Sequence, residues 1–165
     1  MNQMRLNQLR AAVLGANDGI ISVSTALVAI IGILGIRELV LTAVAILFAG
    51  AISMAAGEYV SVSAQVNHEV PSEDGVVTSA QAPIHAAAAS FVAFLAGGTI
   101  PAVLSVVTEN SFIVVIAALA LLAASAALTA NKKARIKSTV RLALVGTFAL
   151  GISLLANIVL HRLGV

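Results

Sequence analysis

Apolar residues in this 165-residue chain are gathered into five long runs that few polar positions interrupt. Each run is close to or above the ~20 residues that a helix needs to cross about 30 Å of hydrocarbon. Their length, and the lack of alternation between apolar and polar positions, argue against the strands of a membrane barrel. We therefore predict an all-α membrane protein, a single five-helix transmembrane domain over residues 1–165. The predicted helices are at about 11–36, 39–66, 84–107, 111–130 and 138–161, with a short acidic loop at 67–83.

Composition indicates that the solvent of these helices is lipid. Hydrophobic residues are 60% of the chain and charged residues 10%, and the mean hydropathy is +1.07, whereas a soluble domain carries about 25% charged residues. The run from Ile113 to Leu128 has almost no polar position, although a surface helix of a soluble bundle needs a polar face. The absence of cysteine excludes disulfides and thiolate metal sites. No nucleophile and base stand at a recognisable spacing, so we predict no enzyme.

Lys and Arg are concentrated on one side of the predicted membrane. Two of them, Arg37 and Arg162, are on the opposite side. The others are Arg5, Arg10, Lys132, Lys133, Arg135, Lys137 and Arg141. The positive-inside rule then places the N-terminus in the cytoplasm and the C-terminus outside or in a lumen. Contact with anionic membrane lipid accounts for the net charge of +2, and we predict no nucleic-acid partner.

The loop at 67–83 is the longest polar segment, and the predicted topology places it in the cytoplasm. It carries acidic and imidazole side chains but no Lys or Arg. One interpretation is a solvated linker, in line with its Pro, Ser, Gly and Asp residues. The other is a vestibule that collects divalent cations, since carboxylate and imidazole groups are ligands for such ions. The candidate residues are His68, Glu69, Glu73 and Asp74, with His85 nearby.

Two acidic residues, Asp18 and Glu58, interrupt the first two apolar runs. A charged side chain at the centre of a membrane helix costs about 2.5–3.5 kcal/mol on insertion scales, so such residues usually face a cavity, a partner or an ion. We expect Arg37 and Glu38 to form the tight turn between the first two helices. Both acids then lie roughly one third of the way from the cytoplasmic face and could converge.

Met54 is four residues before Glu58 and therefore lies on the same helical face. Packing is one role for this methionine, and the buried acid beside it makes metal ligation the other. Sulfur next to oxygen suits a first-row transition metal better than sodium or calcium. Two converging carboxylates would bind protons more tightly, and a divalent cation would displace those protons. Competition between proton and metal at one site is our hypothesis for an exchange mechanism.

Glycines accompany Asp18 and also recur in the third predicted helix. Gly15 and Gly19 are four residues apart, a spacing that lets a second helix approach closely. Around Asp18 this spacing suggests a helix junction with oxygen ligands, and an Asp that bonds its own backbone is the alternative. In the third helix, a hinge and close packing explain the helix breakers equally well. These residues are Gly97, Gly98 and Pro101.

Two long stretches resemble a known family. They are Gly-Ala-Asn-Asp-Gly-Ile-Ile-Ser-Val-Ser-Thr-Ala-Leu-Val, which begins at Gly15, and Ala-Ile-Ser-Met-Ala-Ala-Gly-Glu-Tyr-Val-Ser-Val-Ser-Ala-Gln, which begins at Ala51. Both are similar to the vacuolar iron transporter family, including its nodulin-like branch, and the last three helices match it in layout. The resemblance implies a five-helix protomer in a homodimer. It also implies export of Fe²⁺, or of related ions such as Mn²⁺, Co²⁺ and Zn²⁺, from the cytoplasm in exchange for protons.

The resemblance further implies roles for individual residues. Asp18 and Met54 would form the membrane metal site, Glu58 would be the acid at the cytoplasmic end of the path, and Gly15 and Gly19 would lie near the dimer axis. Members of the family usually insert a long Glu-rich helical domain between the second and third helices, where this chain has only its short acidic loop. The family's cytosolic metal site is therefore expected to be absent, or replaced in part by that loop.

Three functions are compatible with the sequence. The first is a proton-coupled exporter of divalent metals, and the second is a transporter of another cation or small solute on the same scaffold. The third is a nontransporting membrane interaction protein, in which the acids are structural. We expect no permanently bound cofactor. The short chain favours a bacterial plasma membrane, with a vacuolar-type membrane as the alternative.

Overall fold

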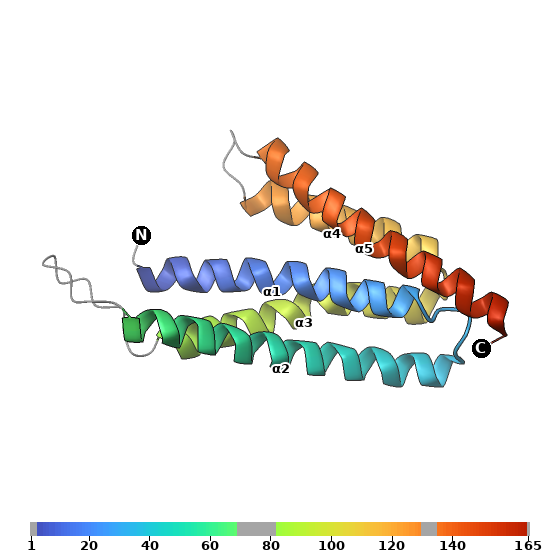
Figure 1. Cartoon of the computed structure of the whole chain (residues 1–165), viewed down its shortest axis with the longest axis horizontal. Coiled ribbons are helices and arrows are strands. Elements are labelled where there is room, and N and C mark those ends of the chain that lie inside the picture. The colour runs from blue at the N-terminus through green and yellow to red at the C-terminus, as the bar shows by residue number, and fades with distance from the viewer. Residues whose placement is uncertain (1–2, 69–81, 130–134, 165) are drawn as a thin grey trace, which may run out of the picture.

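The computed structural model describes residues 3–68, 82–129 and 135–164, which form five α-helices (Figure 1). The helices are α1 (Gln3–Val28), α2 (Ile36–His68), α3 (Ala82–Thr108), α4 (Ser111–Thr129) and α5 (Arg135–Leu163). No strand occurs in the described ranges. All five helices are long and apolar enough to cross a membrane. The prediction of an all-α membrane protein with five transmembrane helices is confirmed, and the orientation of its termini stays a prediction.

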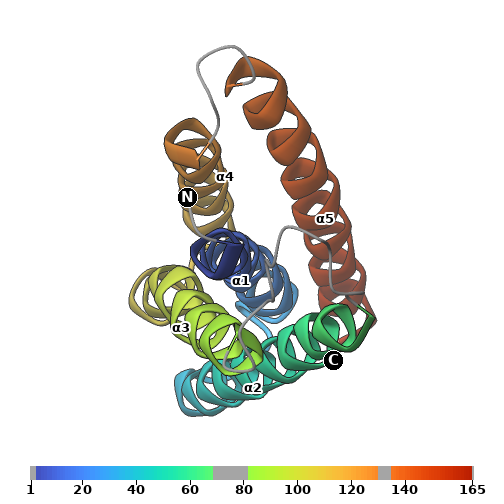
Figure 2. The same ribbon diagram turned by 90° about the vertical axis from the view of Figure 1, so that its left-hand side faces the viewer.

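Helix α1 lies in the middle of the bundle and contacts each of the other four helices. Figure 2 shows α2 and α3 below it, and α4 and α5 above and to its right. The core that these helices share includes the fully buried side chains of Val23, Leu27, Phe94, Leu122 and Leu150. Because α1 is central, its polar residues from Asn17 to Thr25 are buried or partly buried within the bundle.

Helices α1 and α3 pack backbone to backbone through glycines. A Cβ atom at Gly15 would lie 2.5 Å from a carbonyl oxygen of α3, and one at Gly19 would collide with the carbonyl of Phe94. Gly97 of α3 faces the carbonyl of Ala16 in the same way. Glycine permits this approach because it has no Cβ. The glycine face of α1, which the resemblance would put near a dimer axis, is therefore filled by α3 of the same chain.

The three hinge candidates lie inside an unbroken α3. Pro101 is within the helix, and Gly97 and Gly98 are buried beside it. The Cβ position of Gly98 is occupied by the side chains of Val23 from α1 and Leu47 from α2. Of the two explanations that the sequence left open for these residues, the contacts support close packing, while a hinge stays a prediction.

The connection between α1 and α2 occupies residues 29–35, earlier than the sequence suggested. Helix α1 ends at Val28, and within the connection Gly32 adopts a φ of +77°, which a right-handed helix does not contain. Arg37 and Glu38 consequently lie in the first turn of α2 and do not form the turn between the helices.

Asn157 of α5 binds the end of α1. Its Nδ2 atom donates hydrogen bonds to the carbonyl oxygens of Ala29, at 3.2 Å, and Ile31, at 2.8 Å. Both residues lie in the connection just after α1, where carbonyl groups lack helical partners, so a side chain from a neighbouring helix satisfies them here. This contact ties α5 to α1 at the end of the bundle opposite to the basic one.

The outer faces of the helices are apolar. Large exposed side chains include Val60, Phe112, Ile116, Leu144, Phe148 and Leu155. A soluble monomer rarely exposes contiguous apolar surface of this extent, whereas lipid covers it without cost. The polar residues of interest are therefore those that face inward.

Candidate functional site

Glu58 is a buried carboxylate on α2 that pairs with a cation from α1. Its Oε1 atom lies 2.8 Å from Nη2 of Arg10. The side chain of Glu58 is 6% exposed and that of Arg10 is 52% exposed. A carboxylate in an apolar environment needs such a partner, because an uncompensated buried charge is costly. The acid that the sequence assigns to a cation path is thus neutralised by a guanidinium.

Met54 lies one helical turn before Glu58, on the same face of α2. It is partly buried and packs against the shared hydrophobic core. One turn before Met54 on the same face, a Cβ at Gly50 would collide with the ring of Phe94. The stripe of Gly50, Met54 and Glu58 therefore faces the interior of the bundle. A thioether in this position fills space against the core, one helical turn from Glu58.

Asp18 lies near the middle of the apolar span of α1, which covers Arg5–Val28. It is partly buried, and its Oδ1 accepts a hydrogen bond from the hydroxyl of Ser22 at 3.0 Å. Asp18 follows Ala11 by two helical turns and lies on the same face. Ala11 clusters with Val62 of α2 and with Ala82 and Ala86 of α3. The Asp18 carboxylate is therefore on the side of α1 that meets α2 and α3.

Asp18 and Glu58 are at different depths in the bundle. Glu58 pairs with Arg10, which is eight residues before Asp18 and so about 12 Å from it along the helix. The packing of α3 gives the same register, since Gly19 and Gly50 lie against the same phenylalanine. The expected convergence of the two carboxylates is therefore not observed. Instead, the acids are at two levels about two helical turns apart.

The position of the turn explains this difference. A turn at 37–38 would leave Asp18 and Glu58 at nearly equal distances from it, and the two would face each other. With the turn at 29–35, Asp18 is ten residues from the end of α1, whereas Glu58 is 22 residues from the start of α2. Met54 lies between the two levels, so the three predicted residues form a staggered series along the α1–α2 interface.

Sequence reasoning missed two residues of this region, Arg10 and Ser125. The hydroxyl of Ser125 on α4 donates to Oδ1 of Asn17 at 2.5 Å. The sequence identifies Arg10 only as a positive charge that indicates orientation, whereas a turn placed at 29–35 would identify it as the residue of α1 near Glu58. Ser125 carries no such signal, because a serine in an apolar helix commonly bonds its own backbone, as Ser125 also does.

A groove of about 490 Å³ opens beside Arg10, between α1, α4 and α5. It is lined by Leu6, Leu9, Arg10, Val13, Leu14, Asn17, Thr129 and Ser138. Its walls are mostly apolar, and its polar groups are one guanidinium, one amide and two hydroxyls. The groove lies at the basic end of the bundle, on the side of α1 away from α3.

Clusters of three or more His, Cys, Asp or Glu side chains do not occur among the described residues. The cytoplasmic vestibule stays a prediction: His68 is the last residue of α2, and Glu69, Glu73 and Asp74 lie outside the described ranges. His85 is an exposed residue near the start of α3.

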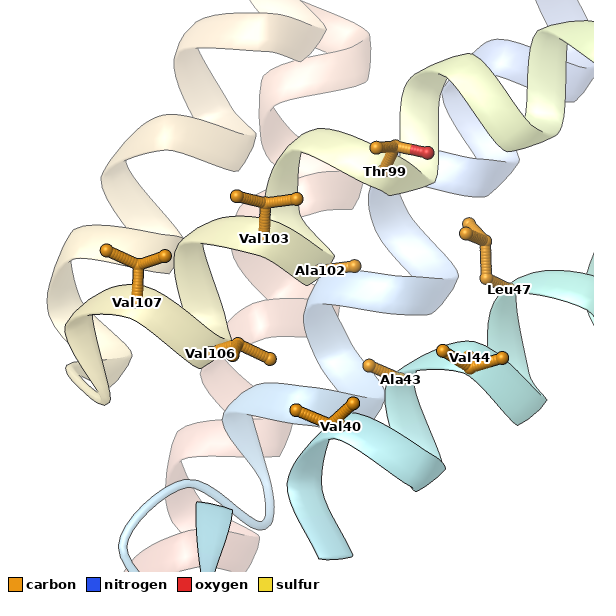
Figure 3. Close-up of a pocket in the computed structure, with 9 residues that line it drawn as sticks. All are labelled: Val40, Ala43, Val44, Leu47, Thr99, Ala102, Val103, Val106 and Val107. Atoms are coloured by element: carbon orange, nitrogen blue, oxygen red, sulfur yellow. The ribbon is translucent and has the colours of Figure 1, made fainter. Parts of the chain in front are cut away.

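A second groove, of about 250 Å³, lies between α2 and α3 (Figure 3). It is lined by Val40, Ala43, Val44, Leu47, Thr99, Ala102, Val103, Val106 and Val107. The one hydroxyl in its lining belongs to Thr99 and donates to the carbonyl of Leu95 at 2.6 Å. This groove offers no carboxylate, thioether or imidazole to a metal. It lies near the start of α2, far from Glu58.

Regions similar to known proteins extend over nearly the whole chain. The VIT family model matches residues 9–74 and 66–157, and the first segment contains Arg10, Asp18, Met54 and Glu58. The protein named vacuolar iron transporter homolog 5 of Oryza sativa subsp. japonica is 36% identical over 163 residues, which cover 90% of this chain and 78% of that protein.

Other relatives align over a shorter part. Vacuolar iron transporter homolog 2 of Oryza sativa subsp. japonica is 44% identical over 112 residues, covering 59% of this chain and 58% of the relative. Vacuolar iron transporter homolog 2 of Arabidopsis thaliana is 41% identical over 103 residues, covering 59% and 53%. The chain thus spans little more than half the length of these two relatives. No solved structure matches it.

Proposed function

Because the chain belongs to the VIT family, we propose that it transports divalent metal ions across a membrane, with Fe²⁺ as cargo. Relatives whose names identify them as vacuolar iron transporter homologues support this cargo. The structure supports transport in two ways. Its five helices are long enough to cross a membrane, and it holds acidic side chains within the apolar interior, where carboxylates typically mark ion pathways.

The observation that carries the proposal is the staggered series of Glu58, Met54 and Asp18. Glu58 is nearest the basic end, Met54 is one turn deeper on α2, and Asp18 is near midspan on the facing side of α1. One helical turn rises about 5.4 Å. A cation could therefore pass from carboxylate to thioether to carboxylate in short steps. This mixture of oxygen and sulfur donors favours a first-row transition metal over sodium or calcium.

We extend the proposal to proton exchange and to export. Each carboxylate holds a proton or a cation, and a protonated site is neutral, which lowers the cost of returning it empty through the membrane. If the basic end is cytoplasmic, as the positive-inside rule predicts, the cation meets Glu58 first and leaves toward the opposite side. Manganese, cobalt and zinc ions have similar ligand preferences and are proposed as alternative cargo.

We also propose a homodimer. Asp18 and Met54 supply two donor side chains, whereas divalent metals in proteins usually take about four to six ligands. Donors from a second copy of the chain, or water, would complete the coordination. The apolar outer faces of the helices provide surface for such an association in the membrane.

The location stays a prediction. The expectation of a bacterial plasma membrane rests on chain length alone, and the relatives are plant proteins with vacuolar in their names. We propose a multi-pass protein of a membrane whose cytoplasmic face carries the basic end.

Transport in proteoliposomes tests the function. Purified protein should take up Fe²⁺ or Mn²⁺ when a pH gradient is imposed, and protein-free liposomes should not. Asp18→Asn and Met54→Ala should each lower the rate by about tenfold or more, a loss seen even for outer-shell partners of a metal. Glu38→Gln is the matched control, because Glu38 is an exposed acid at the far end of α2. Wild-type rates in Asp18→Asn would overturn the proposed path.

A further inference from the structure

The ion pair between Arg10 and Glu58 raises a question that the proposed function leaves open. The carboxylate that a cargo ion would meet first already holds a positive group at 2.8 Å. We propose that Arg10 is a tethered cation that competes with the cargo for Glu58. The inference rests on the proposed function, because it assumes that Glu58 belongs to the cation path.

Space and charge make the two occupants mutually exclusive. A divalent ion binds a carboxylate oxygen at about 2.0–2.6 Å, which is the region that Nη2 of Arg10 fills. Two positive groups on one carboxylate in an apolar interior repel each other strongly, since little solvent screens them. A cargo ion can therefore take Oε1 of Glu58 only after the guanidinium has left that oxygen.

The unequal burial of the pair indicates which partner moves. Glu58 is almost fully enclosed at 6% exposure, whereas Arg10 is 52% exposed. Arg10 also lines the groove between α1, α4 and α5, where the hydroxyls of Thr129 and Ser138 can accept hydrogen bonds from a guanidinium. The apolar wall formed by Leu6 and neighbouring residues suits the aliphatic stem of the arginine. The structure thus holds both an occupied position and a vacant space for this side chain.

Because the residue at position 10 is an arginine, the group that competes with the cargo ion for Glu58 is always positively charged. A guanidinium keeps its charge throughout the physiological pH range. Arg10 therefore cannot release Glu58 by losing a proton; the pair opens when the carboxylate takes up a proton or binds another cation in place of the guanidinium. When the cargo has moved deeper, Arg10 can return and neutralise the carboxylate again, so that no unpaired charge is left inside the bundle.

Equilibrium binding of Mn²⁺ to purified protein in detergent tests this role, with free Mn²⁺ read by electron paramagnetic resonance. If the pair is closed in about nine tenths of the molecules, its removal strengthens apparent affinity about tenfold. Arg10→Gln should therefore bind Mn²⁺ about tenfold more tightly than wild type. Arg10→Lys should lie between the two, because an ammonium pairs with a carboxylate without the planar fork of arginine. This conservative variant keeps the test valid if Arg10→Gln does not fold.

Arg5→Gln is the matched control, since Arg5 is an exposed cation at the same end of α1. It removes the same charge from the same region and should leave Mn²⁺ affinity within about twofold of wild type, as for a screened surface charge. Equal gains in Arg5→Gln and Arg10→Gln would show a general field effect and overturn the competition.

A chemical rescue separates competition from a purely structural ion pair. Millimolar methylguanidinium should weaken Mn²⁺ binding to Arg10→Ala and leave wild type unchanged, because the added ion occupies the vacated position. No effect on Arg10→Ala would overturn the proposal. Glu58→Gln distinguishes the two levels of inference. If it weakens Mn²⁺ binding while Arg10→Gln changes nothing, the competition fails and the cation path stands; if Glu58→Gln binds Mn²⁺ like wild type, Glu58 is not in the path.

Discussion

Replacement of Gly19 by alanine tests the backbone packing of α1 on α3. The new Cβ would collide with the carbonyl oxygen of Phe94 and lie 3.0 Å from the amide nitrogen of Gly98. Backbone atoms cannot rotate away as a flexible side chain can, so the two helices must separate. Overpacking of this kind costs about 1–3 kcal/mol. Alanine recovers about 0.5–1 kcal/mol of this through its higher helix propensity.

Gly151→Ala on α5 is the matched control, because nothing lies within 4 Å of a Cβ at that position. There the propensity gain should act alone and stabilise the protein by about 0.5–1 kcal/mol. The two variants should therefore differ by about 1–3 kcal/mol in the free energy of unfolding. Equilibrium unfolding in mixed detergent micelles, followed by circular dichroism, measures this difference. If Gly19→Ala is as stable as Gly151→Ala, the close approach of α1 and α3 is refuted.

Three further predictions follow from individual contacts. Arg10→Gln leaves a buried carboxylate unpaired and should lower the free energy of unfolding by about 2–3 kcal/mol, which is less than for a fully buried pair because Arg10 is half exposed. Glu58→Gln should lower it by a smaller amount than Arg10→Gln, because no buried charge is left behind. Equal losses of the two variants in detergent unfolding would contradict this. Met54→Leu should alter the free energy of unfolding by less than about 1.5 kcal/mol but lower the rate of Co²⁺ transport more than that of Mn²⁺ transport. An equal decrease of the two rates would show that the Met54 sulfur does not bind the ion. Asn157→Ala should cost about 1–3 kcal/mol and speed hydrogen exchange at the end of α1; unchanged exchange there would show that the two hydrogen bonds are not needed.

Helix number and class could be predicted from the sequence because each helix has enough apolar residues to identify it alone. The boundary between α3 and α4 was also predictable, since polar residues mark it. Asn110 accepts hydrogen bonds from the amides of Phe112 and Ile113, which is the ordinary chemistry of a helix start. The end of α1 was not predictable in this way. Its turn is as apolar as the helices, and Gly32 is a weak signal because glycine is frequent within membrane helices.

In the candidate site, relations within one helix could be predicted from the sequence, whereas relations between helices could not. Met54 and Glu58 share a face because both are on one helix, and helical geometry alone settles that. The relation of Asp18 to Glu58 depends on the turn between two helices, so an error in the turn became an error in depth. The partnership of Arg10 with Glu58 depends on the same register. Ser125 could not be found, because its hydrogen bond to Asn17 depends on how α4 is placed against α1.

The glycine contacts between α1 and α3 also determine which parts of the bundle can move. Backbones in direct contact cannot slide past each other without losing that fit, so these two helices act as a fixed frame. Asp18 belongs to the frame, whereas Met54 and Glu58 are on α2, which meets the frame through side chains such as Leu47 and Phe94. Side chains can repack after a shift of one turn, about 5.4 Å. Such a shift of α2 would bring Met54 level with Asp18, so that, under the proposed function, an ion held by Met54 would reach the level of Asp18 without a rearrangement of α1 and α3.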